Sequence, residues 1–258
     1  MKILDQPVGG MYLWAVALLS FFVIVASYTL HTFPLALVFG VMAAALIEIL
    51  IRKFYLKHKF KIPFSGIITG LIIGSVAPIN ASLFLIAIAV MIAIISKFFI
   101  QFKGSNIFNP ASLGLIIALA IFGVGDEWWV ASNYNIYGIA ISLTPLLVIL
   151  AYEARRLTSA FSFVVVILVL DLILGNYLHS ISLSTFAALL FSVNYYFAFV
   201  MLIEPKTSPH NKYAQIVYGG LTALLYLGFI LYRMPYSLLA ALLLANFSYL
   251  IYRKYWKR

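Results

Sequence analysis

"NIFNPASLG", from Asn106 to Gly114, places two asparagines, a proline and a glycine directly before an unbroken apolar run. Proline has no backbone N–H, so it suits the first turn of a helix, where that donor would lack a partner anyway. Asn109 precedes it and is a preferred N-cap residue. The motif predicts a helix that begins at Pro110, and the positive end of that helix attracts anions, including phosphate. An ordinary capped helix start is the alternative.

The composition indicates that lipid is the solvent for most of the chain. Of 258 residues, 65% are hydrophobic and 9% are charged, and the mean hydropathy is +1.08. A soluble protein of this size could not hide so much apolar surface. The absence of cysteine excludes disulfides, thiolate-held iron–sulfur clusters and Cys-type zinc sites within the chain. We therefore predict an all-α polytopic membrane protein without a metal site.

Ten apolar segments are long enough to cross or enter a bilayer. The first begins at about Met11, directly after "MKILDQPVGG", and we expect it to be retained as a span rather than removed as a signal peptide. The ten segments are approximately 11–30, 33–51, 64–77, 81–100, 109–124, 134–151, 158–175, 184–203, 213–232 and 235–252.

The positions of the basic residues predict the orientation. If the N-terminus is cytoplasmic and the sides alternate, all of the 17 Lys and Arg residues except Arg233 fall on the inside. We therefore predict ten passages through the cytoplasmic membrane, with both termini cytoplasmic. The net charge of +10 follows from this loop pattern and does not indicate nucleic-acid binding. Trp128 and Trp129, in an outer loop with Asp126 and Glu127, are expected at the membrane interface.

The segments divide into five and five, which predicts one integral membrane domain over 1–258 with halves 1–125 and 126–258. An odd number of spans per half would invert the second half, as in transporters with inverted repeats and broken helices. The residues themselves show no convincing repeat. In the third segment, Gly66, Gly70 and Gly74 share one helix face, which predicts close helix packing; backbone that lines a pore is the alternative.

A second proline-broken stretch is "FVMLIEPKTSPHNKY", residues 199–213. Glu204 ends an apolar run, Pro205 and Pro209 stiffen the connection, and Thr207 and Ser208 supply hydroxyls. A carboxylate here could bind a cation or cap a neighbouring helix, whereas a solvated inside loop is the simpler interpretation. We predict that the two motifs lie together and line a polar cavity for a cofactor or other ligand. The predicted lining residues are Asn106, Phe108, Asn109, Pro110, Glu204, Pro205, Thr207 and Ser208.

Together the two motifs resemble those of a membrane protein family shared by two ion-pumping assemblies. Its members are the RnfD component of Rnf electron-transport complexes and the NqrB component of the sodium-pumping NADH:quinone reductase. "NIFNPASLG" is similar to the family's FNPA-type motif, and "IEPKTSP" to its Thr-Asp-Pro-Val-Thr-Ser-Pro motif. Asn246 in "LLLANFSYLI" is similar to a position in the family's closing helix. The resemblance runs from about Pro63 to the C-terminus, and it implies a ten-helix inverted-repeat fold resembling urea and ammonium channels, with a role in redox-driven ion pumping.

The resemblance also implies a flavin joined through phosphate to a threonine in a Ser-Gly-Ala-Thr-like loop. Between Gly123 and Ser192 no such loop occurs, because the stretches around Thr158 and Thr185 lack the motif's glycine. We therefore predict no covalent flavin. Any cofactor would be a non-covalently held flavin or a group supplied by a partner.

Other ionisable residues are candidates for ion handling. Asp171 lies toward the outer end of the seventh segment, where an unpartnered carboxylate is costly, so Asp171 and Glu204 are the predicted ion or proton relay residues. Glu48 is one turn from Arg52 and is expected to form a local pair. His31 and His179 lie near the outer face; haem ligation is conceivable, but solvated side chains are expected.

The leading functional hypothesis is a membrane component of an Rnf/Nqr-like complex that couples electron transfer to ion movement. Its partners would be the lipid bilayer and redox subunits, either a flavoprotein or an iron–sulfur protein. Two alternatives are a stand-alone channel or transporter for a small solute or ion, and a membrane anchor for a soluble flavoprotein. The chain has no catalytic triad, P-loop or dinucleotide fingerprint, so we expect no catalysis by the chain alone.

Overall fold

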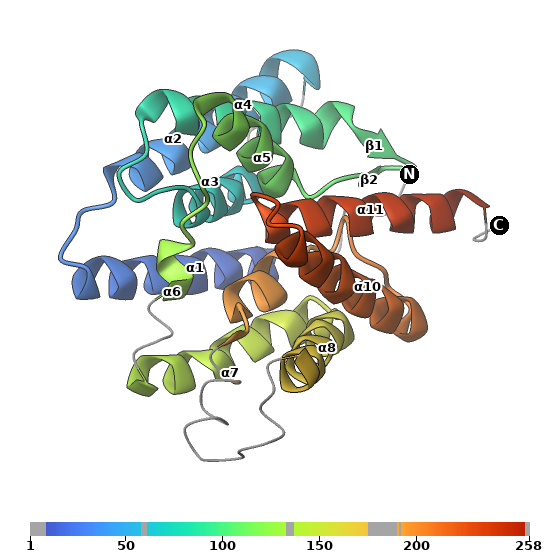
Figure 1. The fold of residues 1–258 in the computed structure, drawn as a ribbon. Coiled ribbons are helices and arrows are strands. Elements are labelled where there is room, and N and C mark those ends of the chain that lie inside the picture. The colour runs from blue at the N-terminus through green and yellow to red at the C-terminus, as the bar shows by residue number, and fades with distance from the viewer. Residues whose placement is uncertain (1–8, 58–60, 133–136, 175–189, 191, 256–258) are drawn as a thin grey trace. The chain divides into compact units, whose positions relative to one another are not determined.

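The computed structural model describes residues 9–57, 61–132, 137–174, 190 and 192–255. These residues form helices joined by short loops, together with one two-stranded hairpin (Figure 1). The chain divides into two compact units. The first consists of Met1–Gln101 and Pro110–Val130, and the second of Phe102–Asn109 and Ala131–Arg258.

The first unit is a set of apolar helices. Within it α2 packs against α3 and α4, and α4 packs against α5. Its helices are α1 (Gly9–Thr29), α2 (Leu35–Leu50), the short π-helix η1 (Ile51–Tyr55) that continues α2, α3 (Phe64–Val76), α4 (Leu83–Phe99) and α5 (Pro110–Phe122). The short helix α6 (Trp129–Ser132) lies at the boundary between the units.

In the second unit α10 packs against both α8 and α11. Figure 1 shows α10 and α11 side by side in its orange-to-red part. The helices of this unit are α7 (Tyr137–Glu153), α8 (Leu157–Leu174), the π-helix η4 (Phe197–Met201), α10 (Lys212–Leu231) and α11 (Ser237–Tyr255).

A hairpin that the sequence analysis did not predict connects α4 to α5. It consists of β1 (Gln101–Phe102) and β2 (Ser105–Asn106). Lys103 and Gly104, between the strands, both have positive φ, 49° and 76°. Two consecutive positive φ values are the signature of the tight turn that best fits strand twist. The hairpin places Asn106 at the end of a strand rather than in an open loop.

The helices confirm the predicted all-α membrane class. Four helical stretches are long and apolar enough to cross a membrane: Gly10–Thr29, Leu35–Tyr55, Leu157–Leu174 and Lys212–Leu231. Seven residues of the eighth predicted segment, 184–203, lie outside the described residues, and its described end contains η4. The other nine segments each coincide with a helix. The helices α3 and α5 have 13 residues each, or roughly 20 Å, against a hydrocarbon core of about 30 Å. Ten full passages and the inverted repeat therefore remain predictions.

The glycines of the third segment form a packing face, as predicted. A Cβ atom added to Gly70 would lie 2.6 Å from Cα of Val41, and one added to Gly74 would lie 2.6 Å from Cα of Leu37. Both contacts are with the backbone of α2, so α3 can approach α2 this closely only without side chains. Gly114 of the opening motif has the same role in α5, where an added Cβ would lie 2.1 Å from the carbonyl oxygen of Ala89 in α4.

Trp129 corrects one expectation about the outer loop. The sequence placed it at the membrane interface with Trp128, but its side chain is 2% exposed. Its indole Nε1 donates a hydrogen bond of 2.7 Å to the carbonyl oxygen of Gly74. An indole can bury its ring when its N–H finds an acceptor, and the end of α3 supplies one. Glu127 is also engaged, because its Oε2 accepts from the backbone N–H of Ile79 at 2.6 Å.

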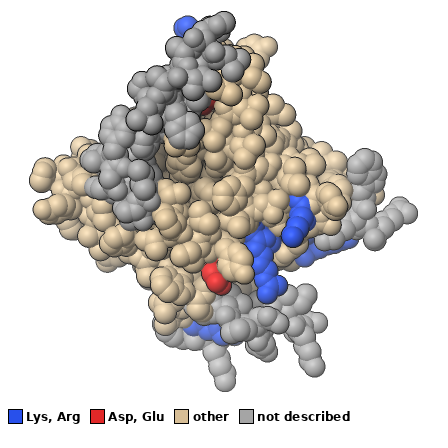
Figure 2. Space-filling view, turned by 90° about the horizontal axis from the view of Figure 1, so that it is seen from below, with Lys and Arg blue, Asp and Glu red and all other residues tan. Residues whose placement is uncertain are grey.

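The surface agrees with a lipid environment. Large apolar side chains protrude from several helices, among them Trp14, Met42, Phe84 and Val217. Most of the described surface in Figure 2 is formed by uncharged residues, with Lys and Arg side chains in a few places. Exposed apolar side chains on so many helices are typical of contact with a membrane.

The predicted topology can be tested with reporter fusions. A reporter inserted beside Asp126 should lie outside the cell and one fused after Arg258 should lie in the cytoplasm, because the basic loops favour that orientation. Alkaline phosphatase and green fluorescent protein fusions distinguish the two sides. Activity of the same reporter at both positions would contradict the count of passages.

Candidate functional site

The two proline-containing motifs meet in the second unit at the carboxylate of Glu204. Nδ2 of Asn106, at the end of β2, donates a hydrogen bond of 3.4 Å to Oε1 of Glu204. Oγ1 of Thr207 donates to Oε2 over 3.5 Å. Both contacts are long for hydrogen bonds. Asn106 is 3% exposed, and its Oδ1 has no hydrogen-bond partner in the part of the chain that the structure describes.

Asn109 ties the first motif to two other elements of the same unit. Its Nδ2 donates to the carbonyl oxygen of Met201 at 3.1 Å, and its backbone N–H donates to Oδ1 of Asn246 at 2.8 Å. Asn246 lies in α11, and its Nδ2 donates in turn to the hydroxyl oxygen of Tyr218 in α10 at 2.5 Å. All these groups are buried. The break in the chain before α5 is thus held by side-chain amides.

The second motif follows a π-helix, η4, all of whose residues are buried. Single-turn π-helices are uncommon and occur frequently at functional sites. The loop after η4 folds back on its own backbone. The N–H groups of Thr207 and Ser208 both donate to the carbonyl oxygen of Glu204 at 3.1 Å, and Oγ of Ser208 donates to the same oxygen at 2.7 Å. These bonds fix the loop and leave the Glu204 side chain directed toward Asn106.

Arg156 is the main residue that sequence reasoning missed. It was counted only as an inside basic residue, yet it is 1% exposed. Its Nε donates to Oγ of Ser208 at 2.9 Å, and its Nη2 donates to the carbonyl oxygen of Pro205 at 3.2 Å and lies 2.9 Å from Nδ1 of His210. Burial lowers the pKa of Arg156 from its ordinary value, but a guanidinium remains charged at neutral pH.

The guanidinium therefore clamps the loop that carries Glu204. A neighbouring amide adds to the clamp, because Nε2 of Gln215 donates to the carbonyl oxygens of Arg155 and His210 at 3.0 and 3.1 Å. The signal that could have found Arg156 is the polar composition of both loops. The sequence alone does not show that they meet.

Asp171, the other predicted relay residue, lies in the last turn of α8. Its Oδ2 accepts a hydrogen bond of 2.5 Å from Oγ of Ser192. Phe108 is half-buried, and Pro110 is buried and begins α5, as predicted. His31 is exposed. Thr158 lies in the first turn of α8, whereas His179 and Thr185 lie outside the described residues.

Glu48 forms the predicted local ion pair with Arg52. The carboxylate of this pair is buried, because the Glu48 side chain is only 1% exposed. No group of three or more His, Cys, Asp or Glu side chains that could hold a metal ion occurs among the described residues.

The clamp predicts unequal effects for two adjacent arginines. Arg156→Lys should lower the free energy of unfolding by roughly 2–3 kcal/mol, because one ammonium cannot replace the fork of donors to Ser208, Pro205 and His210. Arg155→Lys is the matched control and should have little effect, since Arg155 is exposed. Thermal unfolding of the purified chain in detergent measures both. Equal melting temperatures for the two variants would contradict the clamp.

Comparison with known proteins agrees with the resemblance of the motifs. The sequence profile of the NQR2, RnfD, RnfE family matches residues 6–190. The match thus begins nearer the N-terminus than the resemblance we inferred, includes the NIFNPASLG motif, and ends before Glu204. No curated protein matches the chain. Because the family match covers more than half of the sequence, this integral membrane protein belongs to the NQR2, RnfD, RnfE family, the membrane subunits of Rnf- and Nqr-type complexes.

Proposed function

We propose that this chain is the membrane component of a redox-driven ion-translocating complex and that Glu204 is a relay site for the transported ion or a proton. The chain would not be catalytic alone. Electrons would pass through partner subunits, a flavoprotein or an iron–sulfur protein. Asp171 is the second relay candidate, at the far end of α8 from the Arg156 loop.

The pairing of Asn106 with Glu204 carries this proposal. It joins a residue of the matched motif to a carboxylate 98 positions away. Glu204 follows directly on a predicted membrane segment and is only partly exposed; a carboxylate in such a place is costly to keep and is a functional candidate for that reason. Carboxylate, amide and hydroxyl oxygens are also the ligands that hard cations prefer. The Oδ1 atom of Asn106, buried without a hydrogen-bond partner among the described residues, would complete such a set with Glu204 and Thr207.

The two long hydrogen bonds to Glu204 support the same idea. Asn106 Nδ2 and Thr207 Oγ1 approach different carboxylate oxygens at 3.4 and 3.5 Å. Neutral donors at these distances stabilise a carboxylate less than close charged donors would. These two donors would therefore yield to an incoming proton or small cation more readily than close charged donors would.

Replacement of the Glu204 carboxylate by an amide tests the relay. In the complete complex, purified from its native host and reconstituted in proteoliposomes, Glu204→Gln should reduce ion uptake driven by electron transfer at least tenfold. Glu153→Gln is the control, since Glu153 is exposed at the end of α7 and should tolerate the same change. Normal subunit stoichiometry in both complexes would exclude failed assembly. Equal uptake by the two variants would overturn the role of Glu204.

Intact-mass spectrometry of the chain from its native host tests the cofactor. We expect the unmodified mass, because a phosphoester link needs a hydroxyl in an accessible loop and the family's small-residue motif is absent here. An added mass of flavin mononucleotide, localised to Thr158 or Thr185, would contradict the expectation. A visible spectrum of the same preparation, with its co-purified subunits, should show the redox groups of partners.

The two alternative functions predict other outcomes. Ion or solute flux through the chain without partner subunits would favour a stand-alone channel. Co-purification with a flavoprotein, without any ion flux, would favour a membrane anchor.

A further inference from the structure

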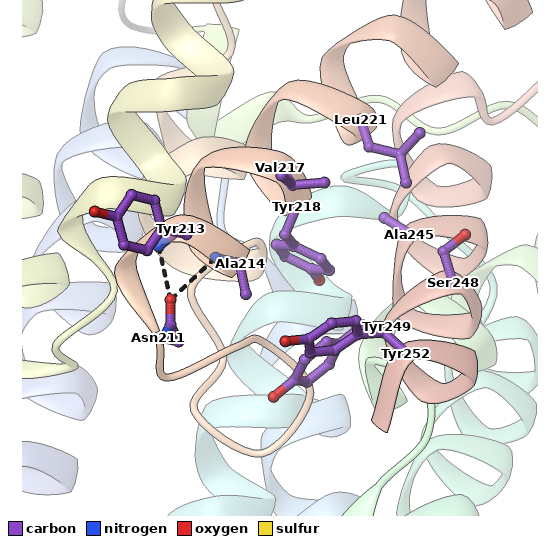
Figure 3. A pocket seen from close by; sticks show the side chains of 10 residues that line it. All are labelled: Asn211, Tyr213, Ala214, Val217, Tyr218, Leu221, Ala245, Ser248, Tyr249 and Tyr252. Carbon is purple, nitrogen blue, oxygen red and sulfur yellow. Dashed lines mark hydrogen bonds between the residues drawn. The ribbon is translucent and has the colours of Figure 1, made fainter. Parts of the chain in front are cut away.

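A groove between α10 and α11 lies outside the two motifs. Its volume is about 440 Å³, within the range of sites that hold small ligands. Ten side chains line it, and four of them are tyrosines (Figure 3). The lining residues are Asn211, Tyr213, Ala214, Val217, Tyr218, Leu221, Ala245, Ser248, Tyr249 and Tyr252.

The groove changes character along the helices. The side chains of Val217, Leu221 and Ala245 form an aliphatic end (Figure 3). Toward the start of α10 and the end of α11 lie Tyr249 and Tyr252, whose rings stack with centroids 6.3 Å apart and planes 19° apart. Tyrosine prefers the boundary between hydrocarbon and water, where its ring is in lipid and its hydroxyl is wet. The groove is therefore apolar at one end and polar at the other.

The polar end also has a positive charge beside it. Arg253 lies in the last turn of α11. Its guanidinium carbon is 5.7 Å from the centre of the Tyr249 ring. Neither helix contains an Asp or Glu residue. Basic pockets between membrane helices on the cytoplasmic side bind the head groups of anionic lipids, and the basic-loop pattern predicts that this end is cytoplasmic.

We propose that this groove is a binding site for an anionic phospholipid, with an acyl chain along Val217 and Leu221 and the phosphate near Tyr249, Tyr252 and Arg253. This lipid site does not depend on the proposed role of Glu204 as a relay residue. Its floor nevertheless touches that network, because the Tyr218 ring lies edge-on to Tyr249 at 6.3 Å and its hydroxyl accepts from Asn246.

Charge removal tests the head-group end. Native mass spectrometry of the full chain in detergent should show retention of phosphatidylglycerol but not of phosphatidylcholine at equal concentration. The variant Arg253→Gln should weaken phosphatidylglycerol binding at least tenfold. Lys57→Gln removes the same charge from an exposed position in the first unit and should leave binding unchanged. Glycerol 3-phosphate, which has the head-group charge but no acyl chain, should not compete.

Steric filling tests the apolar end. Val217 is 67% exposed, so Val217→Trp should fill the groove without disturbing the core and should abolish lipid retention at an unchanged melting temperature. Val165→Trp, at a 54% exposed position of α8, is the control for added bulk. Undiminished phosphatidylglycerol binding by either groove variant, or equal binding of both lipids, would overturn the site. So would cross-linking of Val217 to a partner protein, rather than to a photoreactive phosphatidylglycerol, in the complete complex.

Discussion

The need to pair backbone polar groups that are buried away from water governs the contacts of Asn109. A buried N–H or C=O group without a partner costs about as much free energy as a lost hydrogen bond, so irregular backbone in the interior needs side chains to satisfy it. Asn109 meets this need at two breaks at once. Its backbone N–H donates to Oδ1 of Asn246, and its side-chain amide donates to the carbonyl oxygen of Met201 at the end of the π-helix η4. One asparagine thus secures both the chain before α5 and the chain before the Glu204 loop, and this places Asn106 beside Glu204.

Local chemistry made part of this arrangement predictable. Proline and asparagine predicted the helix start at Pro110, and small residues at fourfold spacing predicted the packing face of α3. Both features depend on residues close in sequence and on the chain's own backbone. Gly114 has the same packing role, but its neighbour, Ala89, lies in α4, and the opening motif alone did not predict the contact. The presence of a carboxylate and hydroxyls between prolines also identified the Glu204 loop as unusual, although composition could not show which partner it meets.

The rest depended on contacts between distant segments. Arg156 satisfies the positive-inside rule as any short-loop arginine would, and only its bond to Ser208, 52 positions away, reveals a buried clamp. Trp129 was misplaced for a similar reason, because its acceptor, Gly74, is 55 positions away. The hairpin that ends at Asn106 had a local signal in Lys103-Gly104, whose positive φ values suit a tight turn. The π-helix η4 has no sequence signature at all, since it differs from an α-helix by a single inserted residue.

The clamp and the carboxylate together limit how a relay could work here. The carbonyl oxygen of Glu204 accepts from Ser208 Oγ, and the same hydroxyl accepts from Nε of Arg156. A charged donor at 2.9 Å holds that hydroxyl firmly, so Arg156 fixes the backbone of the loop. The bonds that the Glu204 carboxylate accepts from Asn106 and Thr207 are longer, at 3.4 and 3.5 Å, and therefore weaker. Under the proposed function, gain or loss of an ion would therefore change these two bonds first, while the hydrogen bonds that fix the loop remain in place.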